Sequence, residues 1–142
     1  MALQEDTYYR LDDQIGFILR KANQRHTGIF AGRMPQDLTP TRFAALAKLL
    51  EHGELSQNEL GRHTAMDSAT IKGVVDRLRE RGLVQTRKAV GDGRLQLVSL
   101  TDKGEEIAEA SLSRAHAVTD ETYGGLDASE RRQLIALLRR IT

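Results

Sequence analysis

Two helix-start signals in the middle of the chain restrict the fold more than any other feature. Ser56 and Glu59 form a capping box, in which each side chain satisfies a free backbone amide at the start of a helix. The helix that they open is short, because its pattern dissolves around His63, and a second start follows at Asp67 or Ser68. A short helix, a tight turn and a longer helix predict a helix-turn-helix.

The longer helix of this pair has one apolar face. Its stripe follows the i, i+3, i+4, i+7 rule before the helix closes at Gly82, and consists of Ile71, Val74, Val75 and Leu78. With that stripe toward the core, Ala69 and Lys72 point outward, and Ser68, Thr70 and Arg77 lie on the flanks. The N-terminal half of the outward face is therefore small and polar, with Lys72 as its one long cation. Such a helix end can enter a major groove and contact base edges or phosphates. In the alternative interpretation, Lys72 only pairs with Asp76 on an ordinary surface helix.

A β-hairpin is predicted after this helix. Two β-branched runs, 84–88 and 95–100, flank a turn built from Gly91, Asp92 and Gly93, and Arg94 lies just past the tip. The two glycines allow positive φ at the tip. A thin loop that carries an arginine fits a minor groove about 6 Å wide, whose negative potential favours the charge. We therefore interpret the hairpin as a wing; the alternative is a structural hairpin with a solvated arginine.

Other side chains are expected to support these two contacts. Asp92 could hold the Arg94 guanidinium in place, and Arg87 and Lys88 on the rising strand are placed for flanking phosphates. We also expect contacts from the start of the short helix, at Ser56 and Gln57. Residues 62–103 carry nine Lys or Arg against five Asp or Glu, so positive charge is concentrated around the hairpin. On charge alone, a solvated charged surface would be the better interpretation.

Amphipathic helices are predicted on both sides of this middle part. One covers 8–33 and ends at Met34-Pro35, and the next begins at Thr39-Pro40 and stops near Gly53. After the hairpin, Thr101 caps a helix that runs to about Tyr123, and a second capping box from Asp127 to Glu130 opens the last helix.

The terminal helices carry apolar stripes that a small winged domain could not bury by itself. The stripes consist of Leu11, Ile15, Ile18, Leu19 and Ala22 near one end and of Leu134, Leu137, Leu138 and Ile141 near the other. A second subunit would bury them.

Composition excludes several classes of function. With no long apolar run and no signal-peptide pattern, we expect a soluble cytoplasmic protein with no membrane partner. Cysteine is absent, so disulfides and thiol-based sensing are excluded. The histidines lack metal-ligand spacing: His26, His52, His63 and His116. Since there is also no nucleophile–base constellation and no phosphate-binding glycine loop, we expect no enzyme activity, no metal and no cofactor.

Three stretches in this order resemble the MarR family of bacterial winged-helix regulators: "LTPTRFAALAKL", "LSQNELGRHTAMDSATIKGVVDRLRERGLV" and "DGRLQLVSLTDKG". The resemblance covers nearly the whole chain and is most specific from Leu55 to Gly104, although Gly93 stands where many members have a charged residue. It implies a mainly α-helical winged helix-turn-helix with a small β-hairpin wing, and a homodimer with interlocked N- and C-terminal helices. One compact chain would then comprise an N-terminal dimerisation helix (1–38), a DNA-binding lobe (39–100) and C-terminal dimerisation helices (101–142).

The resemblance also implies a small-molecule effector. Members of this family commonly respond to phenolic or aromatic carboxylate ligands that bind between the dimerisation helices and the winged lobe. At the matching positions, Arg20 would pair with a carboxylate, Thr41 would hydrogen-bond it and Phe43 would cover the ring. Weaker candidates that rest on position alone are Tyr9, His26, Arg42 and Met66. In the alternative, Arg20 makes a surface or dimer ion pair and Phe43 is plain core.

The leading hypothesis is a repressor that binds a double-stranded, pseudo-palindromic operator and leaves it when the effector binds. A two-fold dimer would read half-sites about 10 bp apart, centre to centre. The alternative is a winged-helix module that docks an acidic protein partner and recognises no specific DNA.

Overall fold

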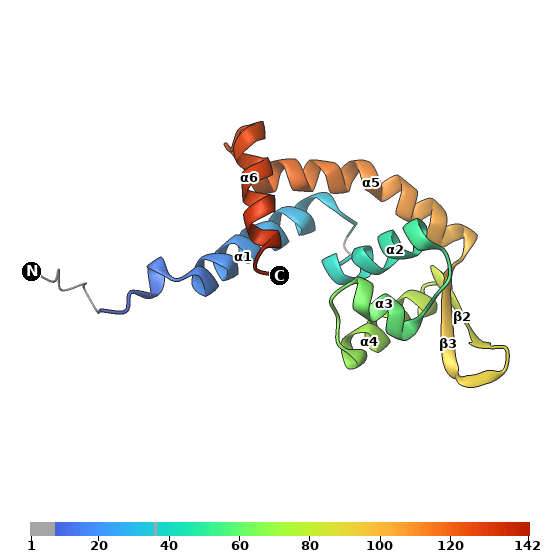
Figure 1. The fold of residues 1–142 in the computed structure, drawn as a ribbon. Coiled ribbons are helices and arrows are strands. Elements are labelled where there is room, and N and C mark those ends of the chain that lie inside the picture. The colour runs from blue at the N-terminus through green and yellow to red at the C-terminus, as the bar shows by residue number, and fades with distance from the viewer. Residues whose placement is uncertain (1–7, 36) are drawn as a thin grey trace, which may run out of the picture.

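The computed structural model describes residues 8–35 and 37–142, arranged as a lobe with an arm of longer helices extending from it (Figure 1). The elements in chain order are η1 (Leu11–Asp13), α1 (Ile15–Arg33), α2 (Pro40–His52), β1 (Leu55–Ser56), α3 (Gln57–His63), α4 (Ser68–Glu80), β2 (Val84–Ala89), β3 (Asp92–Leu100), α5 (Asp102–Tyr123) and α6 (Ala128–Arg139).

The lobe contains α2, α3, α4 and the sheet, packed around one apolar core. Its fully buried side chains come from every one of these layers: Leu46, Leu49, Leu60, Ile71, Val75, Leu78 and Val98. Helix α2 begins as predicted, because the Thr39 side chain accepts from the Arg42 amide and proline follows at the first helical position. It also ends as predicted, at Gly53, whose φ of +77° suits glycine.

The sheet has three antiparallel strands in the order β1-β3-β2, whereas the sequence predicted only two. The missed strand, β1, is two residues long and pairs Leu55 with Val98 and Ser56 with Leu97. No local pattern announces a strand this short, since it exists only through its pairing with β3.

The hairpin tip also differs from the prediction. Lys88 pairs with Gln96 but Ala89 pairs with Asp92, so the ladder shifts register and residues 93–95 lie in the irregular part of β3. The connection is therefore the two residues 90 and 91. Gly91 has the expected positive φ of +83°, but Gly93 does not adopt a positive φ. The predicted turn of Gly91, Asp92 and Gly93 is thus wrong by one to two residues.

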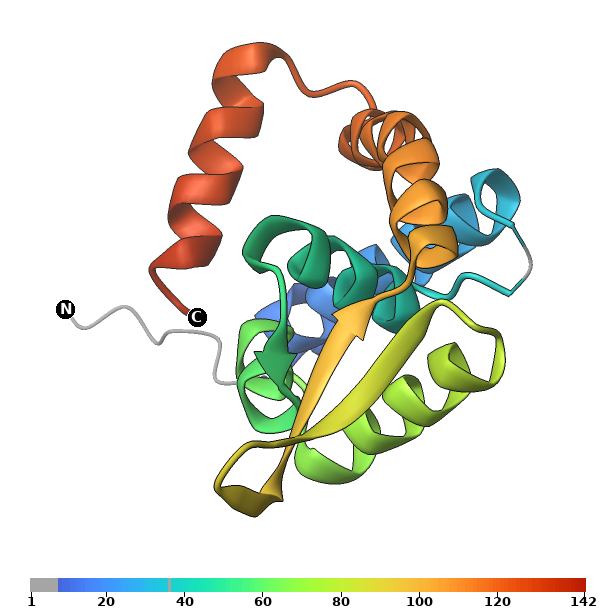
Figure 2. The same ribbon diagram turned by 90° about the vertical axis from the view of Figure 1, so that its right-hand side faces the viewer.

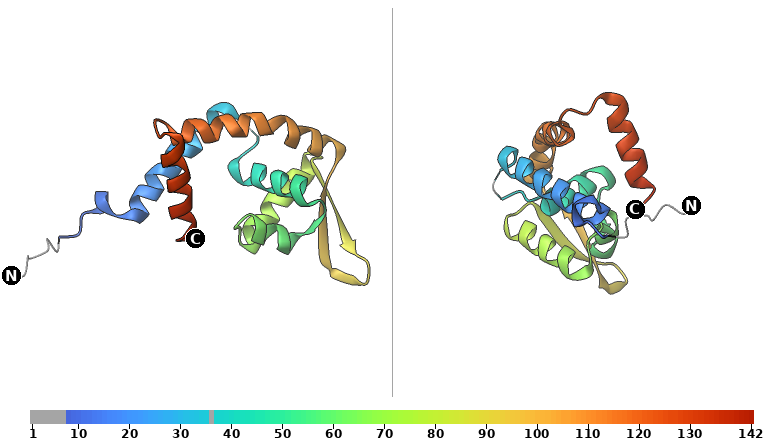
Figure 3. Two further views of the ribbon diagram at one scale, coloured as in Figure 1. Left: turned by 45° about the horizontal axis from the view of Figure 1, so that its top comes forward. Right: turned by 90° about the vertical axis from the view of Figure 1, so that its left-hand side faces the viewer.

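Helices α1 and α5 lie side by side and form the arm (Figures 1 and 3). Arg33 pairs with Glu121, and the Arg25 guanidinium donates to the Glu121 and Thr122 carbonyls at the end of α5. The predicted helix over 8–33 is wrong in its first turns. Gln14 is extended and separates the short 3-10 turn η1 from α1; aspartates such as those in η1 favour turns and caps over helix interiors.

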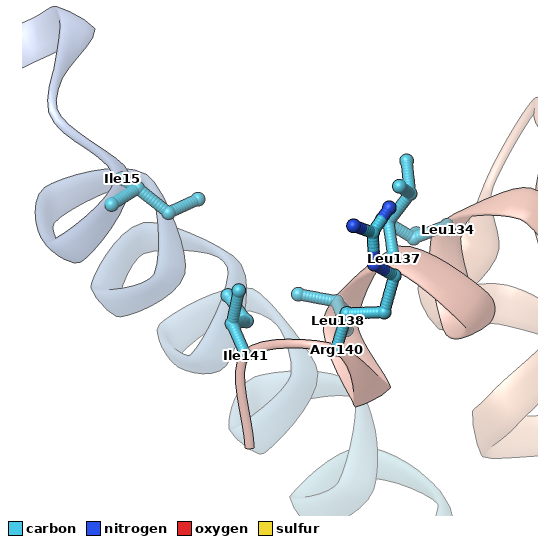
Figure 4. Close-up of a pocket in the computed structure, with 6 residues that line it drawn as sticks. All are labelled: Ile15, Leu134, Leu137, Leu138, Arg140 and Ile141. Carbon is cyan, nitrogen blue, oxygen red and sulfur yellow. The ribbon is translucent and has the colours of Figure 1, made fainter.

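Helix α6 opens with the predicted capping box at Asp127 and Glu130 and stands apart from the lobe (Figure 2). Its apolar stripe and that of α1 remain largely solvent-exposed, at Ile15, Ile18, Leu19, Leu134, Leu137 and Ile141. Between the two helices lies an open cavity of about 440 Å³ (Figure 4). Within the described residues, no helix is both long and apolar enough to cross a membrane.

Candidate functional site

Helix α4 presents the face that the sequence predicts to meet DNA. Asp67 caps the helix, and its Oδ1 accepts a hydrogen bond of 2.7 Å from the Thr70 amide. That hydrogen bond holds the pKa of the Asp67 carboxyl below its ordinary value. The predicted apolar stripe is buried, while Ser68, Ala69, Thr70 and Lys72 are exposed. The first turns of α4 therefore offer small polar side chains and one cation to solvent.

The exposed cationic side chains along α4 form ion pairs with carboxylates of the same helix. Lys72 Nζ lies 2.8 Å from Asp76 Oδ2, and Arg79 Nη2 lies 3.2 Å from Asp76 Oδ1. The Lys72 hydrogen bond lowers the pKa of the Asp76 carboxyl. Arg77 pairs with Glu80 at 3.3 Å. The alternative pairing of Lys72 is thus present, but the lysine side chain is 67% exposed, and such a solvated pair exchanges partners at little cost.

Ser56 is buried, which does not fit its predicted contact with DNA. Only 3% of Ser56 is exposed to solvent. The Ser56 Oγ accepts a hydrogen bond from the Glu59 amide at 3.1 Å, and Glu59 Oε1 accepts one from the Ser56 amide at 3.2 Å. These hydrogen bonds lower the pKa of the Glu59 carboxyl. The hydroxyl is therefore used in the capping box, and the half-buried Gln57 is the remaining candidate at this helix start.

The wing lies beside α4. Arg79 Nη1 on α4 is 3.2 Å from the Thr86 hydroxyl of β2, and the hairpin projects beyond the helices of the lobe (Figure 2). Lys88 and Arg94 are exposed on it. Asp92 does not hold the Arg94 guanidinium as predicted: its Oδ1 instead accepts from the Arg94 backbone amide at 3.0 Å. Asp92 therefore fixes the backbone at the tip and leaves the arginine side chain to project.

Arg87 has a partner that the sequence did not predict. Its Nη2 lies 2.6 Å from Glu54 Oε1 and its Nε lies 3.1 Å from Glu54 Oε2, a bidentate pair. This partner raises the pKa of the Arg87 guanidinium. The predicted contact of Arg87 with a flanking phosphate would therefore be made by a side chain that already holds Glu54. Glu54 is separated from Arg87 by thirty-three positions, and no spacing rule connects them.

The predicted effector residues are only partly brought together. Phe43 packs against Phe30 with ring centroids 6.0 Å apart, and Phe30 lies 6.4 Å from the His26 ring, so these three rings form a row between α1 and α2. Phe43 is also packed against the core, as its alternative interpretation holds. The other candidates lie elsewhere: Arg20 and Thr41 are exposed, Arg42 donates to the Asp37 carbonyl, Met66 is in the turn before α4, and Tyr9 precedes α1.

His26 has a defined hydrogen-bonding direction. The Thr122 hydroxyl donates to the Val118 carbonyl at 2.7 Å, so it receives the proton of His26 Nδ1 at 2.9 Å. In the neutral ring, Nε2 is then the acceptor. His26 and Thr122 also line a mainly apolar cavity of about 320 Å³ between α1, α5 and α6, and His26 is the one predicted effector residue in its wall. Among the described residues, no three His, Asp or Glu side chains converge to hold a metal ion.

Comparison with known proteins gives a consistent result. A sequence model of the MarR family matches residues 36–95. The HTH-type transcriptional repressor NicR of Pseudomonas putida is 42% identical over 139 residues, covering 96% of this chain and 87% of that protein. The crystal structure of a probable transcriptional regulator from Pseudomonas aeruginosa is 50% identical, with a TM-score of 0.90 over 94% of this chain and 100% of that one.

A further similar structure is BpsR of Bordetella bronchiseptica, whose DNA binding is regulated by 6-hydroxynicotinic acid. It is 36% identical to this chain, with a TM-score of 0.90, and the match covers 94% of this chain and 96% of BpsR.

Proposed function

Because the chain belongs to the MarR family of transcriptional regulators, we propose that it is a repressor that binds an operator as a homodimer and is released by a small aromatic carboxylate. One observation carries the DNA-binding part of this proposal: α4, with its exposed front, and the wing, with the exposed Arg94, belong to the same lobe (Figure 1). Two adjacent grooves of a duplex can be contacted at once by such a pair of elements. We expect it to act in the cytoplasm and to have no catalytic activity.

The roles of the two elements follow from their side chains. Ala69 and Thr70 are small enough to let α4 approach base edges, and Lys72 is long enough to reach a phosphate. Arg94 on the wing is suited to the minor groove. Lys88 and Arg77 would contact flanking phosphates.

Dimerisation is supported by the unpaired apolar faces of α1 and α6. Six large apolar side chains stay exposed there, more than scattered surface residues would explain: Ile15, Ile18, Leu19, Leu134, Leu137 and Ile141. A second copy that buried these faces would place two wings and two α4 helices on one side of the DNA. The half-sites would then be about 10 bp apart.

The effector proposal rests on the row of rings and on Arg20. A planar aromatic acid in the cavity between α1, α5 and α6 can stack beside His26. Arg20 is exposed and does not line that cavity, so its role as the carboxylate partner rests on the family resemblance. The free Nε2 of His26 accepts from a ring N–H or O–H. Since 6-hydroxynicotinic acid regulates DNA binding by BpsR, hydroxylated pyridine carboxylates are the first ligands to try.

The DNA-binding proposal is tested by selecting duplexes from a randomised pool and measuring affinity by fluorescence anisotropy. Lys72→Ala and Arg94→Ala should each weaken binding. The slope of log K against log salt is negative, and Lys72→Ala should make it shallower by about 1.8, because a dimer loses two phosphate contacts worth about 0.9 each. Arg132→Ala removes the same charge from exposed α6 and serves as the control. If both lobe variants bound like the wild type, the proposed interface would be wrong.

The rival function, a protein-interaction module, predicts a different result in the same assay. The basic lobe would then bind all duplexes alike, with strong salt dependence and no enrichment of a two-fold sequence. Enrichment of such a sequence distinguishes the two.

A further inference from the structure

The ion pair between Arg87 and Glu54 connects two parts of the lobe. Arg87 lies on β2 opposite Leu97 of the central strand, and Leu97 pairs on its other side with Ser56 of β1. The Arg87 side chain therefore spans β3 to reach Glu54, which directly precedes β1. The ion pair links the outer strand of the wing to the segment that enters the helix-turn-helix.

The geometry of the pair leaves one edge of the guanidinium available. Arg87 Nε donates to Glu54 Oε2 at 3.1 Å and Arg87 Nη2 donates to Glu54 Oε1 at 2.6 Å. Both hydrogen bonds lie on one edge of the planar guanidinium. In the described part of the chain, Nη1 makes no hydrogen bond, and the Arg87 side chain is 56% exposed. An arginine held through Nε and Nη2 still has the two N–H donors of Nη1, which can bind a second anion without loss of the first.

We propose that Glu54 is a positioning residue for DNA binding: it holds Arg87 across the sheet so that Nη1 meets a phosphate beside the wing. The proposal rests on the proposed function, because it requires that the lobe binds DNA. Holding the side chain in advance reduces the rotamer freedom that is lost on binding. The raised pKa of the Arg87 guanidinium agrees with a close pair.

Removal of Glu54 should change the affinity for DNA in the direction opposite to the one that charge alone predicts. Glu54 is a negative charge on a DNA-binding lobe, so its removal should strengthen binding to a polyanion if charge alone mattered. If Glu54 positions Arg87, its removal should weaken binding instead. The sign of the change therefore separates the two interpretations.

The test uses the full-length protein and the operator selected as above. We expect Glu54→Gln to weaken affinity about threefold to tenfold and to make the negative salt slope shallower by about 1.8 for a dimer. The control is Glu51→Gln, which removes the same charge from the nearby end of α2, where Glu51 pairs with Lys48. It should bind as tightly as the wild type or slightly more tightly. Equal or tighter binding by Glu54→Gln would overturn the proposal.

A charge exchange separates positioning from simple support of the fold. Glu54→Arg combined with Arg87→Glu restores an ion pair across β3, and we expect it to restore the melting temperature. It should not restore affinity, because the cation no longer extends from β2. Recovery of both properties would show that the pair only stabilises the sheet. A wild-type protein without operator preference would instead refute the proposed function itself.

Discussion

Gly104 lies in the first turn of α5, where the arm meets the lobe. We predict that its replacement by alanine destabilises the protein. A Cβ at this position would lie 1.8 Å from the Leu83 carbonyl oxygen, about 1.6 Å closer than the 3.4 Å at which ordinary contact begins. The obstacle is backbone rather than the end of a flexible side chain, so it cannot rotate away. The turn of α5 must move away from the segment that leads into β2.

That movement would break the hydrogen bonds that hold the joint. The Thr101 amide donates to the Leu83 carbonyl at 3.1 Å, and the Thr101 hydroxyl donates to the Gly82 carbonyl at 2.6 Å. Each is worth about 1 kcal/mol net, and overpacking adds about 1–3 kcal/mol. We therefore expect Gly104→Ala to lower the free energy of unfolding by about 3–5 kcal/mol and the melting temperature by roughly 10–20 °C.

The measurement is thermal and urea unfolding followed by circular dichroism, with Gly73→Ala as the matched control. Gly73 is also helical, but nothing lies within 4 Å of its added Cβ. Its replacement should be neutral or stabilise the protein by up to about 1 kcal/mol through helix propensity. If the two variants melted together, the close approach at Gly104 would not limit stability and the reasoning would be refuted.

Two further predictions concern release and assembly. Arg20→Ala should keep operator affinity but abolish release by an aromatic acid in the anisotropy assay, because the carboxylate loses its cation; loss of DNA binding would make Arg20 a scaffold residue. Leu137→Asp should give monomers by sedimentation and lose operator affinity, since a charge on the α6 stripe cannot be buried at an interface; a stable dimer would contradict the proposed interface.

The sequence predicted those parts of the fold that depend on local rules. Both predicted capping boxes start helices at the predicted positions: Ser56 with Glu59, and Asp127 with Glu130. A capping box can be recognised from sequence because it is complete within four residues. The apolar stripe of α4 that begins at Ile71 is buried as predicted, because helical periodicity determines which face turns towards the core.

Features that depend on distant partners could not be predicted in this way. Strand β1 exists only because β3 passes beside it, and Arg87 meets Glu54 only after the sheet has formed. The sequence analysis predicts a DNA contact at Ser56, but the residue is buried. Its burial follows from pairing with Leu97, which local sequence does not reveal.

The ion pairs of the DNA-free protein predict which of Lys72 and Arg94 contributes more to operator affinity. Lys72 must exchange Asp76 for a phosphate, so part of what it gains on the DNA replaces what it already has. In the described part of the chain, the Arg94 guanidinium has no carboxylate partner, because Asp92 binds the Arg94 backbone instead. Arg94 therefore gives up no ion pair when it binds. We expect Arg94→Ala to weaken operator binding more than Lys72→Ala, and the reverse order would mean that the wing does not enter the groove.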